Sequence, residues 1–424
     1  MNKGVFLVRF RKNTYYSFAS LLPILVKNFP EFSIQFIREK NPTIIADIVL
    51  NSINHSKTTK IFFFDSFMSV DVPIVKNEML AIMKNLTKDQ RKRLIAVAGG
   101  AHPTAAPINT LDLGFDISAK GEGEIIIEKI VRVILSNDSW ELIPGIAYND
   151  QGLVKQTPLP QKVVLDDYLP YSIEPSIHPP IEISRGCSFG CKFCQVPRIL
   201  RSIRYRSLES IDKIVKYYYE KFNHRSNVDI RFISPNSLEY GSKDHRKPDL
   251  DSLWNLVKTV KKYPVRMFLG SFPSEIRPEF VNPKTVEILQ QSDSKIVAIG
   301  AQSGNENMLQ KMNRGHSLQE ILDCVDYLLE GDLIPQLDFI LGLPEETVNE
   351  MWDTVNIVKK FVKKNCHIRF HAFLPLPGTP WGSNPGTPVP DDIVKEVGAL
   401  IQNPKVNGAF SKQLELVKPV FSYR

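Results

Sequence analysis

The chain contains little cysteine: five residues in 424, with none before position 187. With so few cysteines, most of them clustered, a disulfide framework is not expected, and a reducing, cytoplasmic environment fits better. Three of the five fall within eight residues, at Cys187, Cys191 and Cys194. Thiols gathered so tightly in a cysteine-poor chain predict a metal centre.

Long apolar runs are also missing. A membrane-spanning helix needs about 18 or more predominantly apolar residues, and the best run, 18–26, is half that length and contains Pro23. The N-terminus lacks a signal-peptide pattern, because Arg9 and Arg11 follow the short apolar run 4–8 at once. The sequence therefore predicts no transmembrane segment and no secretory leader.

Neither sign of charge dominates the composition. There are 53 Lys and Arg against 46 Asp and Glu, which gives a net charge of +7 and a pI of about 8.9. This small excess is spread along the chain, so we expect no specific nucleic-acid partner. The length and the 43% hydrophobic content are those of a globular protein with about two domains.

Residues 1–145 alternate between strand-like and helix-like patterns. The strands expected from apolar runs are 5–8, 33–37, 61–64 and 94–98, and the helices expected from periodicity are 16–26, 44–53, 75–83 and 124–135. This α/β alternation predicts a doubly wound, Rossmann-like domain with a parallel sheet. Two glycine-rich loops, GGAHPT at 99–104 and GEGE at 121–124, lie where such a sheet binds ligands.

Residues 146–180 are expected to form a linker, because a turn pattern at 149–152 is followed by six prolines between Pro158 and Pro180. A second α/β domain is expected over 181–380, followed by a C-terminal extension, 381–424. Its expected strands are 181–184, 228–234, 265–270, 295–300, 334–341 and 366–373. Apolar spacing predicts the first helix, capped by Ser207.

The three clustered cysteines follow the first of these strands in a CxxxCxxC spacing. Soft thiolate ligands select zinc, copper(I) or iron–sulfur clusters. A structural zinc site takes four protein ligands, and no fourth is obvious because Cys324 and Cys366 lie far along the chain. Three thiolates on a four-iron cluster would leave one iron open. A zinc knuckle and three unrelated thiols remain the alternatives.

The CxxxCxxC motif with Phe193 before its last cysteine resembles the radical S-adenosylmethionine (SAM) enzymes. The resemblance implies a [4Fe–4S] cluster on these cysteines and SAM bound at the open iron, where it is cleaved to a 5′-deoxyadenosyl radical. It also implies a partial (βα)6 barrel, and the elements 233–237, 300–304, 338–344 and 374–380 are similar to the family's elements in order. The SAM contacts that it implies are Phe193, Ser234, Asn236, Ser237, Gln302, Ser303, Ile340 and Gly342.

The GGAHPT and GEGE loops together resemble the cobalamin-binding domain that precedes many radical SAM domains. The contacts implied are Gly99, Gly100, His102, Thr104, Gly121 and Glu122. The cobalamin-dependent mutases carry a cobalt-ligating histidine in the first loop, whereas residues 9–16 here contain none. We therefore expect cobalamin between the GGAHPT loop and the barrel mouth without a histidine below cobalt, His102 being the alternative. A degenerate domain kept for packing or substrate docking is the other possibility.

The resemblance favours cobalamin-dependent methylation of an unreactive carbon. Cobalamin-free coupling or cyclisation is the alternative, and a methylthiotransferase is disfavoured because it would need three N-terminal cysteines. A non-enzymatic binding module is disfavoured because the cluster ligands and the SAM elements are all there. The substrate could be a small molecule, a lipid or a peptide, and reduction of the cluster implies a ferredoxin- or flavodoxin-type electron donor.

Strand alternation predicts a charged barrel lumen, because polar residues share one face of each strand. Buried charges need partners, so Asp229, Arg231, Asp338 and Arg369 are expected to pair among themselves. His371, at the carboxyl end of the last strand, is the candidate catalytic residue for substrate contact or proton transfer. The arginines at 198, 201, 204 and 206 form either a solvated helix flank or a docking patch, and Arg277 is a candidate for the SAM carboxylate.

Overall fold

The structure, a computed structural model, describes residues 4–11, 14–56, 60–170, 179–200, 202–222 and 227–421. The chain forms two compact units, Met1–Pro179 and Pro180–Arg424. In the described residues, no helix is both long enough and apolar enough to cross a lipid bilayer.

The first unit is built on a seven-stranded sheet in the order β2-β1-β3-β4-β5-β6-β7. Its strands are β1 Gly4–Arg9, β2 Phe32–Ile37, β3 Ile61–Ser66, β4 Leu94–Gly99, β5 Ile117–Ala119, β6 Ile146–Asp150 and β7 Leu153–Gln156. The first five strands are parallel, and β6 and β7 add antiparallel pairs. The predicted doubly wound α/β domain is therefore confirmed.

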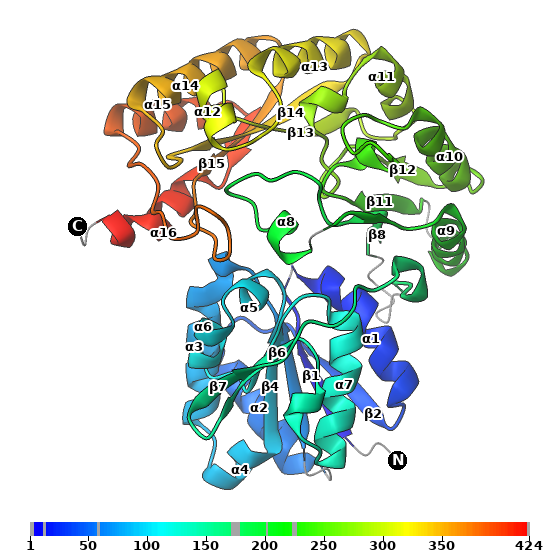
Figure 1. Cartoon of the computed structure of the whole chain (residues 1–424), viewed down its shortest axis with the longest axis vertical. Helices are drawn as coiled ribbons and strands as arrows, with labels where there is room; N and C mark the ends of the chain where they lie inside the picture. Colours follow the sequence, from blue (N-terminus) through cyan, green and yellow to red (C-terminus); the bar gives the residue numbers. More distant parts are fainter. Residues whose placement is uncertain are drawn as a thin grey trace. The chain divides into compact units, whose positions relative to one another are not determined.

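Helices cover both faces of this sheet (Figure 1). They are α1 Tyr15–Asn28, α2 Pro42–His55, α3 Val72–Lys84, α4 Lys88–Arg93, α5 Ala101–Ala105, α6 Pro107–Asp112 and α7 Gly123–Ser136. On β1, Phe6 and Val8 join the core formed with α1 and α7, while Leu7 joins the core formed with α2 and α3. Strands buried on both faces explain the continuous apolar runs in the sequence.

The predicted linker needs correction. Strands β6 and β7 form the hairpin expected at 149–152, but β6 pairs with β5 and extends the first sheet. Ile146, Ala147 and Tyr148 are buried there, so this segment belongs to the first unit rather than to a connection. Residues 171–178 of the expected linker lie outside the described residues.

The second unit contains two parallel sheets, in the orders β12-β11-β8 and β13-β14-β15-β16. A bridge between Ile276 and Ile299 connects the segment after β12 to β13. Its strands are β8 Ile181–Glu182, β9 Ser184–Arg185, β10 Arg204–Tyr205, β11 Asp229–Ile233, β12 Arg266–Phe268, β13 Ile296–Gln302, β14 Ile334–Leu341, β15 His367–Ala372 and β16 Val406–Gly408. The predicted strands are present, and the C-terminal extension contributes β16.

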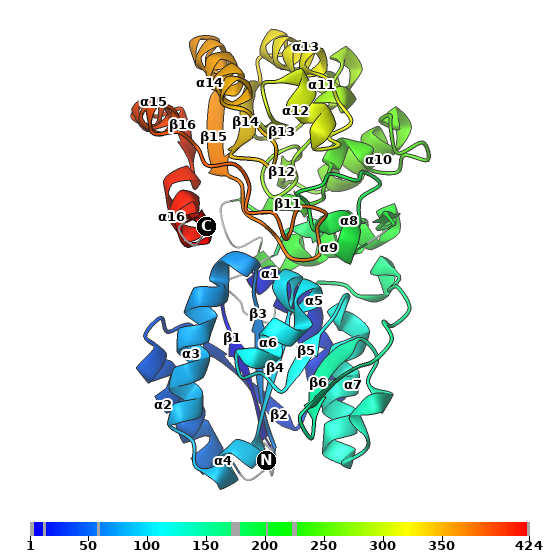
Figure 2. The same ribbon diagram turned by 60° about the vertical axis from the view of Figure 1, so that its left-hand side comes forward.

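Helices pack outside these strands, as α13, α14 and α15 do beside β13–β15 in Figure 2. The helices are α8 Val196–Ile199, α9 Leu208–Phe222, α10 Leu250–Lys261, α11 Pro283–Leu289, α12 Glu306–Lys311, α13 Leu318–Glu330, α14 Val348–Lys363, α15 Asp391–Ile401 and α16 Phe410–Phe421. Ser207 caps α9 as predicted, because its Oγ accepts the Ser210 N–H at 3.1 Å. On β15, Ile368 and Phe370 are fully buried while Arg369 and His371 are partly exposed, which is the predicted alternation.

Candidate functional site

The three clustered cysteines lie on one loop that begins directly after β9. Cys191 is buried, and Cys187 and Cys194 are partly exposed. The loop turns tightly, with Gly186 at φ +91° and the Cys194 N–H donating to the Cys191 carbonyl at 3.2 Å. A Cβ at Gly190 would lie 2.9 Å from Asn313 Nδ2. Backbone geometry therefore favours glycine at Gly186, while Gly190 leaves room for the close approach of the Asn313 side chain.

The cysteine loop is held by a second segment, residues 312–314, which lies more than a hundred residues further along the chain. Between α12 and α13, the Met312 carbonyl accepts the Lys192 N–H at 3.0 Å. Asn313 Nδ2 donates to the Gly190 carbonyl at 3.1 Å, and Arg314 Nη1 lies 3.5 Å from Cys191 Sγ. Sequence reasoning missed this segment, because a cation beside glycine after a short helix is an ordinary loop composition.

Two buried arginines face Cys191. Arg277 Nη1 lies 3.9 Å from Cys191 Sγ, and its Nε donates to Glu279 at 2.5 Å. Its Nη2 donates to the Arg314 carbonyl. Each nitrogen of Arg277 has one partner within the protein, and the expectation that Arg277 binds the SAM carboxylate stays a prediction.

The same arginines distinguish the three thiols electrostatically. Burial raises the pKa of Cys187, and it raises the pKa of Cys194 to about 11. Burial also acts on Cys191, but the charges of Arg314 and Arg277 outweigh it and bring its pKa below the ordinary value. Cys191 is therefore the thiol that is most readily held as a thiolate.

The three cysteines supply soft thiolate ligands of the kind that iron–sulfur clusters take. Among the described residues, no three His, Cys, Asp or Glu side chains are grouped closely enough to hold one metal ion. The three thiols interact electrostatically, because negative charge on Cys187 and Cys191 contributes to the raised pKa of Cys194. Cys187, Cys191 and Cys194 would hold the cluster.

The expected SAM residues after β11 are buried close to the cysteine loop's strand. Ser234 Oγ lies 2.7 Å from Ser184 Oγ and accepts the Asn236 N–H at 3.2 Å. Asn236 Nδ2 is buried and has no hydrogen-bond partner in the structure as described. Ser237 instead turns toward the Ser274 carbonyl at 3.5 Å. Asn236 is thus the residue of this group that keeps a donor for a ligand.

Sequence reasoning also missed Glu239, which follows this group. Its Oε1 accepts the Ser188 hydroxyl at 2.9 Å, while Oε2 is buried without a partner among the described residues. Burial raises its pKa to about 7. A buried acid with one open oxygen, next to the cysteine loop, suits a cationic ligand group.

The expected SAM residues on β13 and β14 differ in their surroundings. Gln302 is buried at φ +78°, a strained conformation for a non-glycine residue and one that clusters at functional sites. Ser303 Oγ lies 3.3 Å from Thr354 Oγ1 and so anchors α14 rather than facing a ligand. Gly342 requires its glycine at φ +80°. Ile340 and Phe193 are half-buried.

The lumen prediction is half right. Asp338 pairs with Arg369, whose Nη2 also lies 2.8 Å from Glu275 Oε1. Asp229 instead binds Arg266 at 2.5 Å, and the Arg231 guanidinium lies 4.0 Å from the Phe268 ring centroid.

His371 shares the lumen side with Arg369. It lies opposite Ile340 in the β14–β15 register. Burial, and then the charge of Arg369, lowers its pKa, while Gln413 of α16 hydrogen-bonds to it. Its catalytic role stays a prediction.

Arg206 is the one described arginine of the run after the cysteines that is buried, so it belongs to neither a solvated flank nor a docking patch, whereas Arg198 is exposed. Arg206 is only 1% exposed. Its Nε donates to the Glu182 carbonyl at 3.0 Å, and Nη1 donates to Ser210 Oγ at 3.2 Å. Arg201 lies outside the described residues.

In the first unit, the two glycine-rich loops are joined by Thr104. Its hydroxyl donates to the Gly100 carbonyl at 2.7 Å and accepts the Gly121 N–H at 3.0 Å. Gly100 has φ +98°, and a Cβ there would lie 2.9 Å from Ser66 Oγ. Ser66 Oγ is buried and has no partner in the described part of the unit. These features fit a flat ligand against the loop that starts at Gly99.

His102 and Glu122 are engaged within the protein. His102 Nδ1 lies 3.0 Å from Ser69 Oγ, and its Nε2 lies 2.9 Å from Asn109 Oδ1. Glu122 Oε2 accepts the Val163 N–H at 3.3 Å. With both ring nitrogens occupied, His102 is not poised to bind cobalt, so the alternative ligand is disfavoured.

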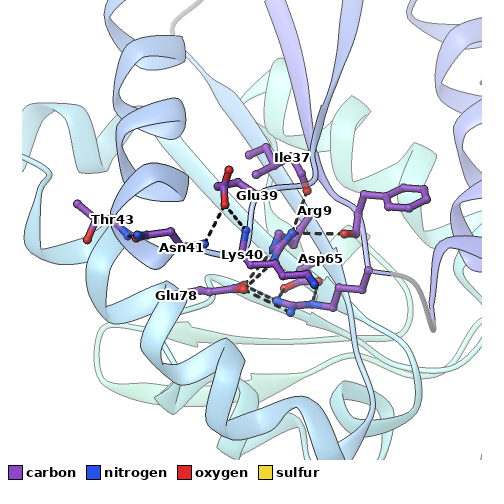
Figure 3. Close-up of polar contacts among 10 residues, drawn as sticks. Arg9, Ile37, Glu39, Lys40, Asn41, Thr43, Asp65 and Glu78 are labelled. Atoms are coloured by element: carbon purple, nitrogen blue, oxygen red, sulfur yellow. Dashed lines mark hydrogen bonds and ion pairs between the residues drawn. The ribbon is translucent and has the colours of Figure 1, made fainter.

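Where the mutases carry their histidine, this chain carries a buried ion network (Figure 3). Arg9 Nη2 lies 2.6 Å from Glu78 Oε1, and Arg11 Nη2 lies 2.8 Å from Asp65 Oδ2 and 2.5 Å from Glu78 Oε2. All four side chains are less than a tenth exposed. Two cations and two anions balance here, which gives the network a structural role.

The sequence of this chain is similar to a family model and to several known proteins. Residues 181–358 match the family model of the radical SAM superfamily. A tRNA-2-methylthio-N(6)-dimethylallyladenosine synthase from Sulfurihydrogenibium sp. is 27% identical over 55% of this chain, which spans 52%, about half, of that relative. An uncharacterized methyltransferase from Pyrococcus horikoshii is 22% identical over 81% of this chain and 74% of its own length.

Two solved structures share the fold. The radical SAM methyltransferase TsrM from Kitasatospora setae, with cobalamin and a [4Fe–4S] cluster bound, matches with a TM-score of 0.68 at 15% identity, over 90% of this chain and 74% of its own. The cobalamin-dependent SAM radical enzyme OxsB, with aqua-cobalamin and SAM bound, gives 0.65 at 15% identity, over 96% of this chain and 62% of its own. The matched family model and the cysteine loop together identify residues 181–358 as a radical SAM region, a part of the chain that belongs to the radical SAM superfamily.

Proposed function

We propose that this chain is a cobalamin-dependent radical SAM enzyme that methylates an unreactive carbon. The observation that carries the proposal is the fold. In this chain a 2-1-3-4-5 parallel sheet with the GGAHPT loop precedes a radical SAM region, and the fold matches those of TsrM and OxsB over 90% and 96% of this chain. When bound, the cluster and SAM supply a hydrogen-abstracting radical, and methylcobalamin supplies the methyl group.

We assign the following cofactor-binding roles to residues of the chain. Cys187, Cys191 and Cys194 bind the cluster, and Asn236 and Glu239 keep polar atoms for SAM. The loop from Gly99 to Thr104 binds the corrinoid without a histidine below cobalt. A ferredoxin- or flavodoxin-type protein supplies the electron.

A methylthiotransferase is the competing assignment, because relatives named tRNA-2-methylthio-N(6)-dimethylallyladenosine synthase match at 25–27% identity. Such an enzyme would need a second cluster on N-terminal cysteines. The chain has no cysteine before Cys187. We therefore do not extend that activity to this chain.

Equilibrium binding of hydroxocobalamin to the anaerobically purified chain tests the proposal. We expect a bound corrinoid spectrum, and we expect Gly100→Ala to weaken binding at least tenfold because its Cβ would meet Ser66 and the Phe67 backbone. Gly152→Ala is the matched control: Gly152 also has φ +91°, but a Cβ there would meet nothing within 4 Å. Circular dichroism verifies that both variants fold.

No binding to the wild-type chain would favour the cobalamin-free alternative. Electron paramagnetic resonance of the cob(II)alamin form should lack nitrogen coupling from histidine, because His102 is engaged on both ring nitrogens. A triple alanine variant of Cys187, Cys191 and Cys194 separates the two cofactors: it should lose iron and retain corrinoid binding.

A further inference from the structure

Arg314 differs from the other cations around the cysteine loop. Its Nη1 lies 3.5 Å from Cys191 Sγ, and its Nη2 donates to the Gly300 carbonyl at 2.6 Å. The residue is only 9% exposed, and its Nε is buried with no partner in the described structure. The guanidinium thus contacts a cluster ligand and retains one donor for a bound group.

The charge balance next to Cys191 is uneven. Arg277 is neutralised by Glu279, whose Oε1 lies 2.5 Å from Arg277 Nε. His316 Nδ1 lies 3.3 Å from the other Glu279 oxygen. Arg314, in contrast, forms no ion pair with a carboxylate among the described residues. The buried guanidinium of Arg314 therefore lies beside Cys191 without a carboxylate partner among the described residues.

We propose that Arg314 is a positioning residue that acts through Cys191 to stabilise the reduced state of the cluster. On reduction one electron arrives from a ferredoxin- or flavodoxin-type donor, and no bond in the chain forms or breaks. The added negative charge is spread partly over the thiolates, and Arg314 attracts it. Net charge, hydrogen bonds to sulfur and burial are the properties that set the potential of such clusters.

This inference rests on the cluster and not on cobalamin or methylation. Its failure is therefore distinguishable from failure of the proposed function, because the potential is measured with neither corrinoid nor substrate present. Arg314 also has an uncharged neighbour, Asn313, which holds the Gly190 carbonyl of the same loop. Comparing the two separates charge from loop positioning.

The experiment is potentiometric titration of the reconstituted full chain, followed by electron paramagnetic resonance. We expect Arg314→Gln to lower the midpoint potential by at least about 59 mV, a tenfold change for a one-electron couple. Arg314→Lys should shift it less, because it keeps the charge. Asn313→Ala should leave the potential unchanged. The double variant Arg277→Gln with Glu279→Gln, which leaves the net charge unchanged, should also shift it little.

A potential for Arg314→Gln equal to that of the wild type overturns the proposal. So does an equal shift in Arg314→Lys and Arg314→Gln, because charge would then not be the cause. If Arg314→Gln does not retain iron, Arg314→Lys is compared with the wild type instead. A midpoint potential equal to that of the wild type supports the proposal, and a shift of about 59 mV or more overturns it.

Discussion

Asp338 shows how burial at a single residue makes stability depend on pH. Burial raises its pKa to about 7, and the neighbouring Glu275 carboxylate adds to this while Arg369 opposes it. An acid whose pKa is raised on folding binds more protons in the folded state between its unfolded and folded values. The free energy of unfolding should therefore fall as the pH rises from about 4 to about 7, by at most about 1.4 kcal/mol per unit.

Asp338→Asn should flatten this slope. Urea unfolding followed by fluorescence at half-unit steps from pH 5 to pH 8 provides the measurement. Asp229→Asn serves as the matched control, because it removes an acid from the more exposed pair with Arg266. A slope in Asp338→Asn as steep as that of the wild type would show that another group carries the pH dependence.

Some residues of the candidate site could be predicted from the sequence, and others could not. The spacing of the cysteines depends only on local chain geometry, so the cysteine loop is readable from the sequence. Arg314, by contrast, is 123 residues from Cys191 and becomes relevant only through the fold. Its residue type carries no signal of that contact, and the same is true of Glu239.

At the scale of elements, Glu346 fixes the turn from β14 to α14. Its buried Oε2 accepts the Gly342 N–H at 2.7 Å and the Leu343 N–H at 2.9 Å. Burial raises its pKa to about 8, so near pH 7 the group is mostly protonated, and an amide side chain resembles it closely.

Glu346→Ala should destabilise the protein by about 1–3 kcal/mol for each amide left without an acceptor. Glu346→Gln should change stability by less than about 1 kcal/mol, because its carbonyl oxygen can accept the same two bonds. Urea unfolding of both variants at pH 7 measures the difference. Equal destabilisation would mean that packing, and not hydrogen bonding, holds the turn.

Strand register explains why the lumen was predicted only in part. Alternation along a strand identifies which residues share a face, but not which strand lies beside it. In the structure, Asp338 lies directly opposite Arg369 across β14–β15, whereas Asp229 lies opposite Arg266 across β11–β12. Very short strands such as β5 and β16 are equally invisible to periodicity, since three residues define no period.

At the scale of the whole molecule, the corrected boundary predicts which fragment is stable. A fragment of residues 1–179 contains the complete seven-stranded sheet, whereas 1–145 lacks β6 and β7 and uncovers the edge of β5. We expect 1–179 to unfold cooperatively and 1–145 to melt at least several degrees lower, as followed by circular dichroism. Equal melting temperatures would show that the hairpin adds no stability.

The contact between the cysteine loop and Met312-Asn313-Arg314 has a consequence for biosynthesis. A ribosome that has just released Cys194 has more than a hundred residues to translate before this second segment emerges. Until then the nascent motif has its three thiols but neither the cation beside Cys191 nor the amide that fixes Gly190. Iron delivery that depends on these finished surroundings would therefore follow translation of this segment.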